Sequence, residues 1–127
     1  MEVINQLPTW DDIGQTTREL VFQFSRNQGL SGLIQVYNVL QYNKFSLQEQ
    51  VYIIVYLHRD NFYMSEMLYA NHLFPDFRGE KDDISWVVRV LDFLDSWTDA
   101  WTIAISNGVT YRGKNSQLQS LYSIVKN

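Results

Sequence analysis

The chain of 127 residues contains no cysteine and only two prolines. Without cysteine it cannot form disulfide bonds, thiolate nucleophiles or metal sites with thiolate ligands. No stretch rich in proline, glycine or serine divides the chain, and a single hydrophobic core suits a protein of this length. We therefore expect one domain that spans residues 1–127.

Positive charge is also scarce, because ten Lys and Arg residues stand against 14 Asp and Glu residues and give a formal net charge of −4. An acidic chain disfavours nucleic acid as a partner. No apolar run approaches the roughly 20 residues that span a bilayer, and the beginning of the chain, MEVINQLPTW, has no secretory signal pattern. The sequence thus predicts an intracellular, cytoplasmic protein that has no contact with a membrane.

Aromatic residues, in contrast, are abundant, and make up 15% of a chain that is 46% hydrophobic and 19% charged. This balance is typical of a folded globular protein. Capping residues and apolar side chains at steps of three and four positions divide the sequence into helices. The expected helices span residues 9–26, 31–41, 46–57, 62–74, 82–107 and 115–125.

The clearest helix start is the segment SLQE, in which Ser46 and Glu49 are placed to form a capping box. The run VYIIVYL that follows, residues 51–57, is β-branched and aromatic, and taken alone it also fits a buried strand. Because the capping box directly precedes this run, we expect a helix.

The segment TIAISNGVTYRG, residues 102–113, is ambiguous. The pair Asn107-Gly108 between alternating apolar residues is typical of a β-hairpin, but it is equally typical of a helix that ends on a left-handed glycine. An apolar stripe continues into this segment at helical spacing, and an isolated hairpin is marginal in water. We therefore expect one long helix that ends at Asn107. The stripe consists of Trp86, Val87, Val90, Leu91, Leu94, Trp97, Trp101, Ala104 and Ile105.

The predicted fold is therefore all-α, a single-domain irregular bundle of about six helices. The alternative that remains open is an α-helical domain with a C-terminal β-hairpin at residues 101–112.

Motifs of catalysis and of metal or cofactor binding are missing. The sequence has no phosphate-binding glycine loop, GxSxG, HExxH or EF-hand loop. Its two histidines, His58 and His72, have Glu66 and Asp76 near them in sequence, but their spacing matches no metal-binding motif. We accordingly predict no catalytic residues, no metal site and no cofactor.

Three carboxylates, Asp92, Asp95 and Asp99, follow one another at i, i+3 and i+7 and would share one face of the long predicted helix. A wet face opposite the apolar stripe explains this spacing without any further assumption. The acidic face also permits another hypothesis, a carboxylate-dependent metal hydrolase.

The segment over residues 62–77 carries more aromatic and methionine side chains than one helix face can bury. Such a composition with few charges is typical of interface cores. A helix that is buried on most sides would explain it as well. The candidate interface residues are Phe62, Tyr63, Met64, Met67, Tyr69, Phe74 and Phe77.

We therefore expect a non-catalytic protein-interaction module, such as an adaptor, an assembly factor or an inhibitor. Its partner would be another protein or further copies of the chain, and the acidic face would set orientation and association rate. A dimeric helix-turn-helix DNA-binding regulator, built from residues 46–57 and 62–74, is the alternative function. It is disfavoured because the second of these helices has no Lys or Arg.

Overall fold

The computed structural model describes residues 6–73 and 81–126, with side chains described for 6–67 and 83–125. These residues form seven α-helices, a short 3-10 turn and a π-helical turn, and they contain no strand. The all-α prediction is thereby confirmed, and the alternative with a hairpin at residues 101–112 is excluded. No helix in the described ranges is long and apolar enough to cross a membrane.

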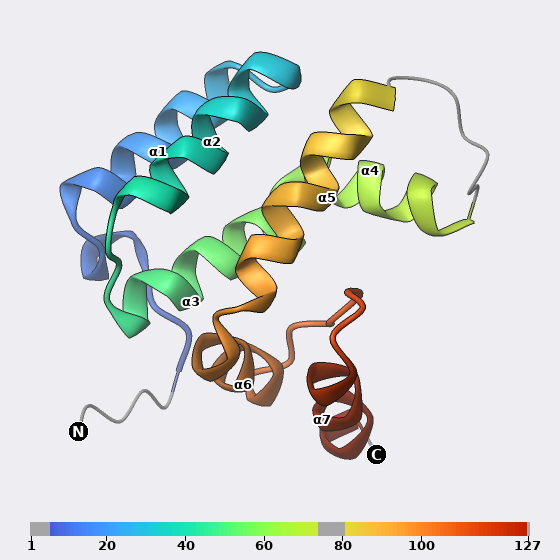
Figure 1. Ribbon diagram of the computed structural model, residues 1–127. Helices are drawn as coiled ribbons and strands as arrows, with labels where there is room; N and C mark the ends of the chain where they lie inside the picture. The colour runs from blue at the N-terminus through green and yellow to red at the C-terminus, as the bar shows by residue number, and fades with distance from the viewer. Residues whose placement is uncertain (1–5, 74–80, 127) are drawn as a thin grey trace.

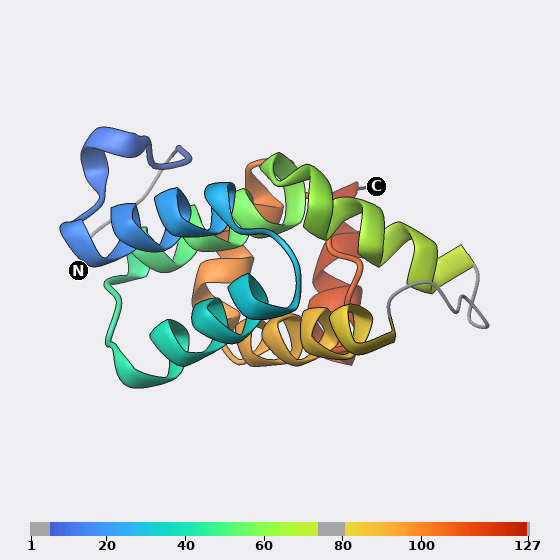
Figure 2. The ribbon, with the colours of Figure 1, turned by 90° about the horizontal axis from the view of Figure 1, so that it is seen from above.

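The helices pack around a central one, α3. Figure 1 shows α1 and α2 side by side at one end of the molecule and α6 with α7 at the other end. Seen from above, α3 and α4 follow each other along one side, and α5 runs along the other side (Figure 2). The elements are η1 (Trp10–Asp12), α1 (Gln15–Arg26), α2 (Leu30–Tyr42), α3 (Leu47–Val55), η2 (Tyr56–Asp60), α4 (Phe62–Leu73), α5 (Lys81–Asp95), α6 (Thr98–Ser106) and α7 (Ser116–Lys126).

The start of the first helix differs from the prediction. Thr9 does initiate helical structure, since its backbone N–H donates to Asp12 Oδ2 at 2.7 Å, but only the short turn η1 follows. The chain is then extended at Ile13, and α1 begins at Gln15. The sequence predicts a helix that continues from Thr9. It does not reveal the later start of α1, because the hydrogen-bond acceptor at that start comes from a distant part of the chain.

That acceptor is Glu49 of α3. Its Oε2 accepts a hydrogen bond from the Gly14 backbone N–H at 3.0 Å and another from Thr17 Oγ1 at 2.6 Å. The predicted capping box is present too, because Ser46 Oγ accepts from the Glu49 backbone N–H at 3.2 Å. Burial raises the pKa of Glu49, but the hydrogen bonds from Thr17, Gly14 and Ser46 outweigh this effect and lower the pKa below its ordinary value. One carboxylate thus fixes the beginning of α1 and of α3.

The buried side chains form two clusters that meet at α3. No residue of α3 is exposed. Ile53 belongs to the first cluster, which the other helices from α1 to α5 complete, whereas Val51, Ile54 and Val55 belong to the second, which α6, α7 and the segment between them complete. The VYIIVYL run is therefore helical through Val55 and continues in the π-helical turn η2.

Seven of the nine residues of the long apolar stripe are buried and Trp86 and Trp97 are partly exposed, but the prediction of one continuous helix over 82–107 is wrong. Helix α5 ends at Asp95, and α6 begins at Thr98. The break at Trp97, with φ −85° and ψ 62°, contains neither glycine nor proline. Its cause is tertiary, since α5 packs against α2 and α4 while α6 packs against α3. A straight helix could not cover both clusters.

The end of α6 agrees with the prediction. Asn107 caps the helix, and Gly108 takes the left-handed conformation with φ +92°. The Val109 backbone N–H returns to the Ala104 carbonyl at 3.0 Å, as in other helix ends with a left-handed glycine.

The contact between α1 and α2 depends on the small size of Gly32. A Cβ at this position would lie 1.7 Å from the Asn27 carbonyl oxygen, which cannot move without the backbone. Although alanine is the better helix former, Gly32→Ala is expected to lower the free energy of unfolding by about 1–3 kcal/mol, the range found for overpacked cores. Urea unfolding measures this change. The exposed Asn38→Ala on the same helix serves as the control, and a Gly32→Ala protein as stable as the wild type would contradict the prediction.

Candidate functional site

The four predicted interface residues whose side chains the structure describes do not share one surface. Phe62 is 78% exposed, but Met64 is fully buried in the first cluster and is thus a core residue. Tyr63 and Met67 are partly buried against the same cluster, and the Tyr63 hydroxyl donates a hydrogen bond to Asp83 Oδ2 on α5. The side chain of Tyr69 and the residues Phe74 and Phe77 lie outside the described part of the chain.

The acidic face does not form as predicted, because the break between α5 and α6 divides it. Asp92 on α5 and Asp99 on α6 are exposed, whereas Asp95 is partly buried at the end of α5. Asp95 Oδ2 accepts a hydrogen bond from the Tyr111 hydroxyl at 2.9 Å. Within the described residues, no three His, Asp or Glu side chains gather as metal ligands would.

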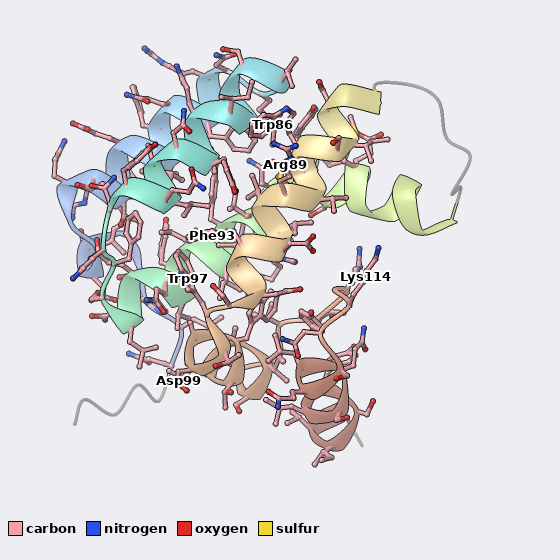
Figure 3. The ribbon with its side chains drawn as sticks, in the orientation of Figure 1. Trp86, Arg89, Phe93, Trp97, Asp99 and Lys114 are labelled. Carbon is pink, nitrogen blue, oxygen red and sulfur yellow. The ribbon has the colours of Figure 1, made fainter. Side chains whose placement is uncertain are left out.

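An aromatic surface that the sequence did not predict lies between α2 and α5. We call it the aromatic seam and define it by Tyr37, Trp86, Arg89, Phe93 and Trp97. Figure 3 shows that Trp86, Arg89 and Phe93 follow one another along α5, on the side of α2, and that Trp97 continues this row just after the end of α5. All four rings of the seam are partly exposed.

The rings of the aromatic seam pack against one another edge to face. Tyr37 of α2 meets Trp86 at 5.6 Å between centroids and Phe93 at 6.1 Å. Phe93 in turn meets Trp97 at 5.9 Å, and the Arg89 guanidinium lies 4.7 Å over the Trp86 ring. Pairs of this geometry contribute about 0.5–1.5 kcal/mol each beyond the burial of their area. The seam is therefore a preformed surface with fixed rings.

The seam leads into a hollow of about 370 Å³ between the end of α2, the connection to α3 and the end of α5. Phe45 and Trp97, with centroids 5.9 Å apart, form part of its wall. The hollow is open to solvent, and polar atoms make up more of its exposed lining than apolar atoms do. The α2–α5 hollow is lined by Leu40, Gln41, Asn43, Lys44, Phe45, Gln50, Phe93 and Trp97.

Four polar residues line the hollow: Asn43 and Gln50, whose side-chain amides bond to the backbone, Gln41 with a third amide, and Lys44 with a positive charge. Asn43 Nδ2 donates to the Val39 carbonyl at 2.9 Å, and Gln50 Nε2 donates to the Phe45 carbonyl at 3.1 Å. Lys44 is exposed and makes no ion pair with a described carboxylate. The hollow thus combines an apolar wall with polar residues that include a single positive charge.

A sequence signal for the seam exists, although it is weak. Trp86, Phe93 and Trp97 recur at steps of seven and four, which places them on one side of a helix. Trp86 and Trp97 were assigned to the buried stripe, and Phe93 fell outside it. The spacing could have indicated an aromatic edge, but not the partner ring of Tyr37 or the hollow beside Lys44.

A second feature is a buried polar cluster where η2, the end of α5, α6 and the segment after α6 meet, formed by His58, Asp95, Trp101 and Tyr111. The His58 and Trp101 rings meet edge to face at 4.6 Å, and Trp101 meets Tyr111 at 4.8 Å. The Tyr111 hydroxyl donates to Asp95 and accepts from the Asn115 backbone N–H at 2.9 Å. Both ring nitrogens of His58, Trp101 Nε1 and Asp95 Oδ1 are buried without a hydrogen bond to the described residues.

Burial dominates the electrostatics of this cluster. It lowers the pKa of His58 to about 3, and the positive charge of Arg112 acts in the same direction. Burial raises the pKa of Asp95 against the opposing effect of the Tyr111 hydrogen bond, and it also raises the pKa of Tyr111. His58 is hydrogen-bonded to neither of these groups, and its low pKa keeps its imidazole neutral at physiological pH.

The buried histidine predicts a loss of stability in mild acid. The unfolded chain takes up a proton near pH 6.5, whereas folded His58 stays neutral down to about pH 3. Stability is therefore fully present above pH 6.5 and falls between these values, by up to about 1.4 kcal/mol per pH unit. The raised pKa of Asp95 works in the opposite direction, because its folded form binds the proton more tightly.

Urea unfolding of the wild type and of His58→Phe between pH 7.5 and pH 5.5 measures this effect. We expect the free energy of unfolding of the wild type to fall with pH and that of the variant to stay flatter, since phenylalanine cannot be protonated. Asp95→Asn serves as the control for the neighbouring carboxylate. Parallel pH profiles of wild type and His58→Phe would contradict the assignment.

Comparison of the chain with protein-family models, with curated proteins and with solved structures found no match.

Proposed function

We propose that this protein is a non-catalytic protein-interaction module that binds a segment of a partner at the aromatic seam and the α2–α5 hollow. The observation that carries the proposal is the hollow itself, about 370 Å³ in volume, with Phe45, Phe93 and Trp97 among its lining residues. Aromatic side chains are enriched in interface cores, and the residues that dominate binding energy cluster in pockets of this kind.

The chemistry of the lining residues favours binding over catalysis. Among the eight residues that line the hollow, only Lys44 has an ionisable side chain, and none carries a carboxylate, an imidazole or a hydroxyl. A catalytic site needs a nucleophile or an acid–base pair within reach of the substrate. The most strongly shifted pKa values belong instead to His58 and Tyr111, in the buried polar cluster. An apolar wall with amides suits the recognition of a side chain.

The seam gives the binding surface its length. Trp86 and Phe93, both on α5, are separated by seven positions, which corresponds to roughly 10 Å along the helix at 1.5 Å per residue. About three residues of an extended peptide, at roughly 3.3 Å each, cover that distance, and Trp97 continues the seam past the end of α5. In this proposal one apolar side chain of the partner enters the hollow while its neighbours lie along the seam. The interface is thus assigned to α2 and α5, not to the predicted α4 residues, of which Met64 is buried.

Selection of peptides on the immobilised protein tests the proposal. We expect twelve-residue peptides to be enriched from a random display library and to bind Gln41→Trp at least about tenfold more weakly, since an indole at this exposed lining position fills the hollow. Fluorescence anisotropy with labelled peptides measures the affinity, and circular dichroism checks that the variant is folded.

The matched control is Gln35→Trp, which places the same side chain on an exposed position of α2 at its contact with α1, away from the hollow. Binding to this variant should stay within about twofold of the wild type. The proposal fails if no peptide is enriched, or if the enriched peptides bind the two variants equally well.

A further inference from the structure

Charge along the proposed binding surface is opposite to that of the whole protein. The chain has a formal net charge of −4, and yet no carboxylate lines the α2–α5 hollow. Its one charged lining residue is Lys44, and the seam beyond it carries Arg89. The lining of the hollow therefore carries one positive charge and no negative charge, on a molecule that is acidic as a whole.

Neither cation is neutralised within the described part of the chain. Lys44 is exposed and forms no ion pair, and Arg89 lies over the Trp86 ring without a carboxylate partner. Asp92 is three residues after Arg89 on the same helix, but the two make no ion pair.

From this arrangement we propose that the partner segment is an acidic peptide in which an apolar side chain enters the hollow and a neighbouring Asp or Glu pairs with Lys44. This inference rests on the proposed function and specifies the chemistry of its partner. Charge complementarity to Lys44 favours an acidic segment as the occupant of the hollow. A second copy of this chain fits less well, because its acidic residues Asp92 and Asp99 lie on helices and not on an extended segment.

The apolar contact provides most of the affinity, and the charge provides selectivity. Burying a Leu or Phe side chain against the wall contributes through the removal of apolar area from water. An ion pair at an exposed rim contributes less, but it discourages a basic residue at the same place and makes the association rate depend on salt. Among peptides with the same apolar side chain in the hollow, we therefore expect the affinity to depend on the charge of the adjacent residue.

A focused peptide library tests this ranking. Its members have one fixed Leu, with the two flanking positions varied among Asp, Glu, Ser, Lys and Arg. On the wild-type protein we expect acidic flanks to be favoured over basic flanks by about tenfold in affinity, and the preference to shrink as potassium chloride is raised from 50 to 500 mM. On Lys44→Glu the preference should reverse, so that peptides with basic flanks bind better than those with acidic flanks.

Lys114→Glu is the matched control, because it makes the same change of charge at another exposed lysine. Figure 3 shows Lys114 on the opposite side of α5 from α2, and it does not line the hollow. This variant should keep the wild-type preference for acidic flanks. A charge preference that responds equally to Lys44→Glu and Lys114→Glu would show a general electrostatic effect and overturn the inference.

The remaining outcomes separate the two proposals. Peptides that lose binding on Gln41→Trp but show no preference for acidic flanks overturn the acidic-peptide inference and leave the interaction module standing. The absence of any peptide sensitive to Gln41→Trp overturns both. Competition by a single-stranded oligothymidylate at similar concentration would overturn the peptide assignment in favour of nucleic acid, whose bases stack on aromatic rings beside cations.

Discussion

The burial of α3 on all its sides is the constraint on which the rest of this fold depends. Every residue from Leu47 to Val55 is at least partly covered, so other helices must enclose α3 from several directions. Helices α1 and α2 with α5 complete one cluster, and α6 with α7 completes the other. A short chain can supply both covers only if it turns sharply between them, which it does at Trp97.

Trp97 is the residue at which the two cores and the surface meet. Its ring packs against both hydrophobic clusters and also lines the α2–α5 hollow. The hollow lies beside the last turn of α5, where residues of α2, α3 and the connection that carries Lys44 also line it. It therefore adjoins the break at which the chain turns from α5 to α6, which packs against α3.

Local signals in the sequence were sufficient for several elements of this structure. The capping box at Ser46 and Glu49 identified α3 as a helix in spite of its strand-like composition, and Gly108 marked the end of α6. Seven of the nine residues in the apolar stripe are buried, since burial depends on spacing along the helix, whereas Trp86 and Trp97 are partly exposed in the seam. These features are encoded within a few residues, which is why they can be predicted without knowledge of the fold.

Features that depend on distant partners were not predictable in this way. The start of α1 is set by a carboxylate 35 positions later, and the break at Trp97 contains no residue that interrupts helices by itself. Whether Met64 lies in a core or at an interface depends on α5, which is remote in sequence. The seam likewise needs Tyr37 from α2 beside Trp86 and Phe93 from α5, so its rings could be noted in the sequence but not assembled.

The position of α3 also bears on the order in which the chain is made. In the folded protein, Val51, Ile54 and Val55 share a hydrophobic cluster with residues that are synthesised later, such as Trp101, which lies 50 positions after Val51. At a synthesis rate of roughly 5–20 residues per second, those partners follow about 3–10 seconds later. During that interval one flank of the central helix is an apolar surface without its native cover. A nascent chain of this protein is therefore a candidate client for ribosome-associated chaperones until α6 has emerged.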